Sequence, residues 1–77
     1  MSDISEFVNS SPSHQVIHEE GGFTIIPKNE DLESLRAFQA IAKRACLYRG
    51  EDYRVIEHHD SDSPIKNSID SVTFLKR

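Results

Sequence analysis

The sequence predicts an α+β domain with the element order ββαββ, in which one amphipathic helix packs on a mainly antiparallel four-stranded sheet behind an N-terminal arm. Two observations predict this fold. Residues 32–48 carry apolar side chains at helical spacing, and two pairs of short segments rich in β-branched and aromatic residues flank them. A chain of 77 residues suffices for one small core. We therefore expect an arm over residues 1–13 and a single domain over residues 14–77.

The first two strands are predicted to form a hairpin. Apolar runs at residues 16–17 and 23–26 stand on either side of a Gly21-Gly22 pair, and glycine supplies the positive φ that hairpin turns require. Pro27 ends the second strand because it has no N–H for the ladder. Asn29 is the expected N-cap of the helix that follows.

The helix is predicted by an apolar arc of about 180° on a helical wheel. Acidic residues in its first turn and basic residues in its last two turns complement the helix dipole. Gly50 is expected to adopt the left-handed conformation just beyond its end. The side chains expected to face the sheet are Leu32, Leu35, Phe38, Ile41, Ala42, Ala45, Cys46 and Tyr48.

The last two strands are predicted over residues 53–58 and 69–75, which are rich in aromatic and β-branched residues. Residues 59–67 between them contain many turn-forming residues and predict a long loop.

The alternation of side chains along the strands predicts two apolar faces on the sheet. One face should lie under the helix, and it consists of Val16, Phe23, Ile25, Tyr53, Val55, Val72 and Phe74. The second face should be mostly polar if it meets only water. It instead carries five large aliphatic residues, namely Ile17, Ile26, Ile56, Ile69 and Leu75.

Two arrangements can cover this second face. In one, the arm folds back and its apolar residues Ile4, Phe7 and Val8 shield the sheet. In the other, which we favour, two copies of the chain bury their second faces together or join their edge strands. Burying these aliphatic side chains is worth several kcal/mol at about 1.5 kcal/mol each. The residues expected at the contact are Ile17, Ile26, Ile56 and Leu75.

Catalytic chemistry is not expected. Cys46 lies on the buried arc near the negative end of the helix, where a thiol is poorly activated, and the serines match no nucleophile pattern. The chain has no glycine-rich phosphate loop. We therefore expect a non-enzymatic protein-interaction module without a cofactor, which forms a homodimer or binds another protein.

A divalent-metal site is an alternative prediction. His58, His59 and Asp60 form the densest group of possible ligands. Neighbouring residues on a strand point to opposite sides, so these histidines favour a solvated strand end over a metal site.

A small nucleic-acid-associated regulator is the other alternative. Arg36, Lys43 and Arg44 share the exposed side of the predicted helix, but a net charge of −4 makes nucleic acid an unfavourable partner. A single cysteine, with no signal peptide and no long apolar stretch, predicts a cytoplasmic chain without a membrane partner.

Overall fold

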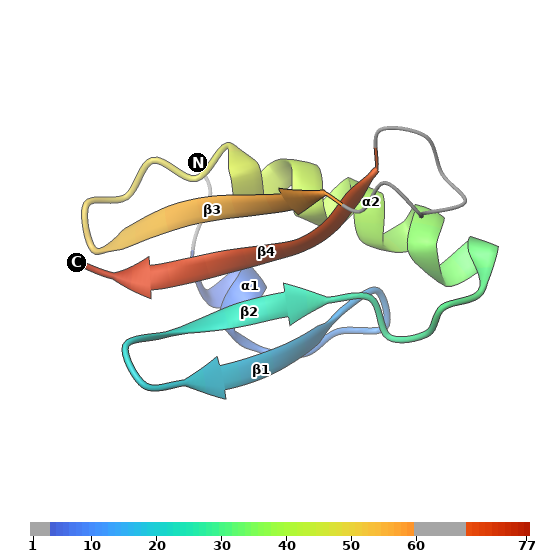
Figure 1. The fold of residues 1–77 in the computed structure, drawn as a ribbon, viewed down its shortest axis with the longest axis horizontal. Coiled ribbons are helices and arrows are strands. Elements are labelled where there is room, and N and C mark those ends of the chain that lie inside the picture. Colours follow the sequence, from blue (N-terminus) through green and yellow to red (C-terminus); the bar gives the residue numbers. More distant parts are fainter. Residues whose placement is uncertain (1–3, 60–67) are drawn as a thin grey trace.

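The structure is a computed structural model, and it describes residues 4–59 and 68–77. Its strands form one antiparallel sheet in the order β1-β2-β4-β3, and both helices lie on the same side of this sheet (Figure 1). The predicted ββαββ fold is confirmed. The elements are α1 (Ser5–Val8), β1 (Gln15–Glu19), β2 (Gly22–Ile26), α2 (Leu32–Cys46), β3 (Tyr53–His59) and β4 (Ile69–Lys76).

The turn between β1 and β2 depends on glycine, as the sequence predicts. Gly21 has a φ of 86°, in the left-handed region that side chains disfavour. Gly22 pairs with Leu75 on β4, and a Cβ at Gly22 would collide with the carbonyl oxygen of Phe74. The absence of a side chain at Gly22 thus allows β2 and β4 to pair up to the hairpin turn.

Both ends of α2 differ from the prediction. The N-cap is Asp31 and not Asn29, because the Asp31 carboxylate accepts hydrogen bonds from the Ser34 backbone N–H at 3.2 Å and hydroxyl at 2.9 Å. These two hydrogen bonds lower the pKa of Asp31. At the other end the helix stops at Cys46, and the capping residue Leu47 stays in the right-handed region.

The prediction that Gly50 adopts a left-handed conformation is wrong, since Gly21 is the one glycine of the three with a positive φ. Gly50 is required for a different reason. The Tyr48 ring occupies the space in which a Cβ at Gly50 would lie. That position lets the Tyr48 hydroxyl donate to the Asp52 carboxylate at 2.5 Å.

The core is centred on the ring of Phe74 in β4, which is fully buried. Its centroid lies 4.7 Å from that of Phe23, 5.5 Å from Phe7, 5.8 Å from Tyr48 and 6.3 Å from Tyr53. Phe23 belongs to β2, Phe7 to α1 and Tyr53 to β3, and Tyr48 lies in the segment after α2. The middle of the predicted helix arc also lies in the core, with Phe38, Ile41, Ala42 and Ala45 all buried.

The N-terminal segment packs into this core on the helix side of the sheet. Phe7 in α1 is fully buried, and so is His14 just before β1. The His14 ring accepts a hydrogen bond from the Ser11 hydroxyl at Nδ1, 2.7 Å away, and its Nε2 donates to the Phe7 carbonyl oxygen at 3.3 Å. The alternative in which this segment covers the second face is therefore wrong. The division at residue 13 stays a prediction.

The start of β4 is held by a side chain of α2. The Gln39 amide nitrogen donates to the Ile69 carbonyl oxygen at 2.9 Å, and its amide oxygen accepts from the Ile69 N–H at 2.8 Å. Ile69 is 8% exposed and lies in the core. Its predicted place on the second face is wrong, because the register shifts between His58 and His59 and Gln39 draws the strand end toward α2.

The strand register defines the face of the sheet that is turned away from the helices, called the open face below. Its residues follow from the pairing of the four strands, because alternate side chains of each strand point to the same side. They are Gln15, Ile17 and Glu19 of β1, Gly22, Thr24 and Ile26 of β2, Arg54, Ile56 and His58 of β3, and Ser71, Thr73 and Leu75 of β4.

We expect Gln39→Ala to lower the free energy of unfolding by about 1–3 kcal/mol, because it leaves the N–H and C=O of Ile69 without their partner. Gln39→Glu keeps the acceptor for the Ile69 N–H but sets a carboxylate oxygen against the Ile69 carbonyl oxygen, so it should also destabilise the chain. Urea unfolding followed by circular dichroism measures both, with the exposed Arg36→Ala as the control. A Gln39→Ala chain as stable as this control would contradict the assigned role.

Candidate interaction surface

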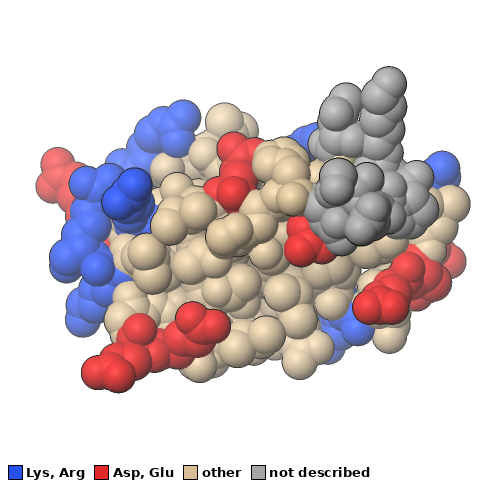
Figure 2. All heavy atoms as spheres, viewed as in Figure 1, with Lys and Arg blue, Asp and Glu red and all other residues tan. Residues whose placement is uncertain are grey.

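The open face carries the four residues predicted for contact, and no described element covers it (Figure 1). Ile17 is 42% exposed and Leu75 is 39% exposed, although both are large aliphatic residues. Ile26 and Ile56 are half-buried by their neighbours in the sheet. Figure 2, viewed from this side, shows a broad uncharged area in the centre and lower middle of the view, with acidic groups above it and most other charged groups toward the two ends. This surface is the strongest candidate for a contact with another molecule.

The polar groups in the middle of the open face bind one another. The hydroxyls of Thr24 and Thr73 lie 3.1 Å apart, in adjacent strands β2 and β4. The Thr73 hydroxyl is also 3.0 Å from His58 Nε2 on β3. This chain of hydrogen bonds crosses three strands, so part of the polar centre of the face is satisfied within the domain.

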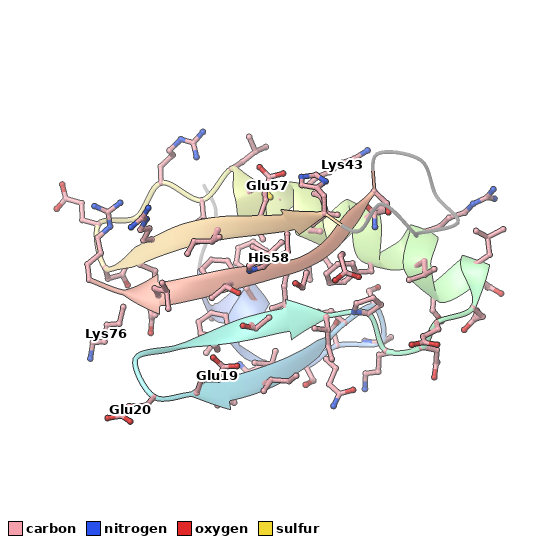
Figure 3. The ribbon with its side chains drawn as sticks, viewed as in Figure 1. Glu19, Glu20, Lys43, Glu57, His58 and Lys76 are labelled. Carbon is pink, nitrogen blue, oxygen red and sulfur yellow. The ribbon has the colours of Figure 1, made fainter. Side chains whose placement is uncertain are left out.

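Among the described residues of the open face, Glu19 and Arg54 are the ones with a permanent charge. They belong to the same row of paired residues, in which Glu19 pairs with Gly22, Gly22 with Leu75, and Leu75 with Arg54. Glu19 is therefore at the β1 edge and Arg54 is at the β3 edge. Figure 3 shows Glu19 and Glu20 near the β1–β2 turn and Lys76 at the same end of the sheet. This end thus has an acidic and a basic corner.

The histidines at the end of β3 do not converge on one point. The ring of His58 lies on the open face beside Thr73, whereas His59 Nδ1 donates to the Ser68 carbonyl oxygen at 3.0 Å. His59 Nε2 lies 3.1 Å from the Glu57 carboxylate. Within residues 4–59 and 68–77 no three His, Cys, Asp or Glu side chains are grouped as metal ligands. Asp60 lies outside the described residues, and the metal alternative stays a prediction.

The basic residues of the nucleic-acid alternative lie on α2, on the other side of the sheet. Arg36, Lys43 and Arg44 are all exposed, and the exposed Glu33 belongs to the same helix. Mixed charges on the solvent side are typical of a helix that packs against a sheet. The nucleic-acid role stays an alternative prediction, separate from the open face.

A shallow cavity of about 270 Å³ lies where the end of α2 meets β3, and Cys46, Arg49, Tyr53 and Glu57 are among its lining residues. One guanidinium nitrogen of Arg49 donates to the carbonyl oxygens of Cys46 and Tyr48, each 3.2 Å away. Burial raises the pKa of the Cys46 thiol to about 11, with a smaller contribution from the Glu57 carboxylate, which accepts a hydrogen bond from the thiol. Cys46 is thus a thiol at neutral pH.

Sequence reasoning missed three features. Gln39 gave no signal, because a glutamine on a helix has many possible partners. The hydrogen bonds among Thr24, Thr73 and His58 depend on the order of the strands, which was not predicted. Glu19 could have been found, since it alternates with Ile17 along β1.

Within the described residues, neither helix has the length and apolar character needed to cross a membrane.

We expect the Cys46 thiol to react with a maleimide at pH 7.5 at least tenfold more slowly in the folded chain than in the urea-unfolded chain, because less thiolate forms. Glu57→Gln should raise the folded-state rate, since it removes the negative charge that disfavours the thiolate. Absorbance or mass spectrometry follows the reaction. Equal rates in the folded and unfolded chains would show that the thiol is not protected.

Comparison of the chain with models of protein families, with curated proteins and with solved structures found no match. The open face and its charges therefore carry the functional argument.

Proposed function

We propose that this domain is a non-enzymatic protein-interaction module that self-associates as a homodimer through the open face. The observation that carries the proposal is the exposure of Ile17 and Leu75 beside the half-buried Ile26 and Ile56. Sheet faces that meet only water are mostly polar, and apolar patches rimmed by polar residues mark contact sites. A second copy supplies a face of the same size and the same apolar character.

The size of the face sets the expected strength of the dimer. Four strands spaced about 4.8 Å apart and five residues long give a face of about 19 by 17 Å. This is about 320 Å² in projection, well below the about 800 Å² that each partner buries in a standard specific interface, so only a weak, reversible contact is expected. We therefore expect a reversible dimer with a micromolar dissociation constant.

The hydrogen bonds on the face favour its burial. Covering a polar group with no partner costs roughly 1–3 kcal/mol. Thr24, Thr73 and His58 already bind one another, so a second copy can cover them without leaving these hydroxyls unpaired. The aliphatic residues on either side then supply the favourable free energy of association.

The measurement that tests the proposal is the solution mass by sedimentation velocity, over chain concentrations from about 1 µM to 1 mM. The mass should rise with concentration from 8.8 kDa toward about 17.6 kDa, twice the mass of the chain. Ile17→Lys and Leu75→Lys should each hold the chain at the monomer mass, because each replaces an apolar side chain of the contact by a charge that association would bury.

Leu47→Lys is the matched control. Leu47 is 65% exposed at the end of α2, so the same apolar-to-lysine change there should leave the dimer intact. Circular dichroism confirms that all variants are folded. A wild-type chain that stays at 8.8 kDa over the whole range would refute self-association. If the control variant weakens the dimer as much as the two open-face variants do, the dimer does not form through the open face.

A further inference from the structure

We infer that the two copies pair face to face about a two-fold axis parallel to the strands, so that Glu19 of each copy meets Arg54 of the other. This inference rests on the proposed self-association and adds the arrangement of the partner. It follows from the register of the sheet, which places the charges of the open face at fixed positions relative to its centre.

The first step is that Glu19 and Arg54 cannot neutralise each other within one chain. They occupy the same row at opposite edges of the sheet, three strand spacings or about 14 Å apart. Neither side chain forms a hydrogen bond or an ion pair with another described residue. Each therefore presents an uncompensated charge at the rim of an otherwise uncharged face.

The second step is the symmetry. A two-fold axis in the contact plane, parallel to the strands and midway between β2 and β4, places β1 of one copy against β3 of the other. Residues of one row then meet residues of the same row. Glu19 faces Arg54 of the other copy, and the symmetry repeats this pair at the opposite edge. One operation thus neutralises both charges of both faces.

The same operation brings suitable partners together in the rest of the contact. Ile17 at one edge faces Ile56 at the other, since both belong to the row that contains Thr24 and Thr73. Leu75 faces Gly22, which has no side chain and leaves space for it. Three of the four aliphatic residues therefore meet an apolar group or space, whereas Ile26 faces Ser71 of its own row. The ion pairs lie at the rim.

An axis perpendicular to the strands gives a poorer contact. It places each row against the row at the other end of the face, so that Glu19 meets Gln15 and Arg54 meets His58. Both charges then stay without an opposite partner. Sheets in aligned sandwiches cross at about 30°, which displaces Glu19 and Arg54, at the corners of the face, by about 5 Å. The long side chains of Glu19 and Arg54 span such a displacement.

Charge reversal tests this arrangement. Glu19→Arg alone and Arg54→Glu alone should each weaken the dimer about tenfold or more, because each creates two like-charge contacts. An equimolar mixture of the two variants should form heterodimers of nearly wild-type affinity, since both contacts are again between opposite charges. The double variant Glu19→Arg/Arg54→Glu should likewise recover the affinity to within about threefold. Sedimentation velocity at low ionic strength measures all four samples.

Arg36→Glu is the matched control, since it reverses an exposed arginine on α2 and should leave the affinity unchanged. If the single variants weaken the dimer and neither the mixture nor the double variant restores it, this arrangement is overturned. The arrangement is also overturned if the wild-type chain forms a dimer and neither single variant weakens it. In both cases the proposed self-association stands. A wild-type chain that stays monomeric refutes self-association itself, so the two failures are distinguishable.

Discussion

The packing of the Phe74 ring determines how the rest of the domain is arranged. Four other aromatic rings, from α1, β2, the end of α2 and β3, lie around it, so one side chain of the central strand β4 joins every layer of the core. Because Phe74 must point toward the helices, Thr73 and Leu75 must point away from them. The pairing of β4 with both β2 and β3 extends this constraint to the whole sheet.

The open face is the direct consequence of that constraint. The residues out of phase with Phe74 and its partners include four large aliphatic side chains, and both helices lie on the opposite side of the sheet. The N-terminal segment does not cover this face, because Phe7 is buried against Phe74 on the helix side. The proposed homodimer gives these aliphatic residues an apolar environment and gives Glu19 and Arg54 opposite charges to meet.

The sequence was sufficient for those parts of the fold that depend on local patterns. Alternation placed Ile17, Ile26, Ile56 and Leu75 on one face, and helical spacing identified the buried side of α2. Features that depend on contacts between distant residues were not predictable. The burial of Ile69 results from an extra residue in β4, where Asp70 is passed over in the pairing with β3, and from a hydrogen-bonded glutamine thirty positions away. Neither has a local signature. The N-cap was misplaced by two residues, because Asn29 and Asp31 are both good capping residues and only the geometry selects one.

The most direct measurement of the central claim is a dilution series followed by methyl NMR of the isoleucine and leucine side chains. We expect the methyl resonances of Ile17, Ile26, Ile56 and Leu75 to shift together with concentration and to fit one dimerisation constant. Those of Leu32 and Leu47, which are exposed at the two ends of α2, should stay constant. Concentration-dependent shifts at Leu32 and Leu47, with none on the open face, would contradict the account.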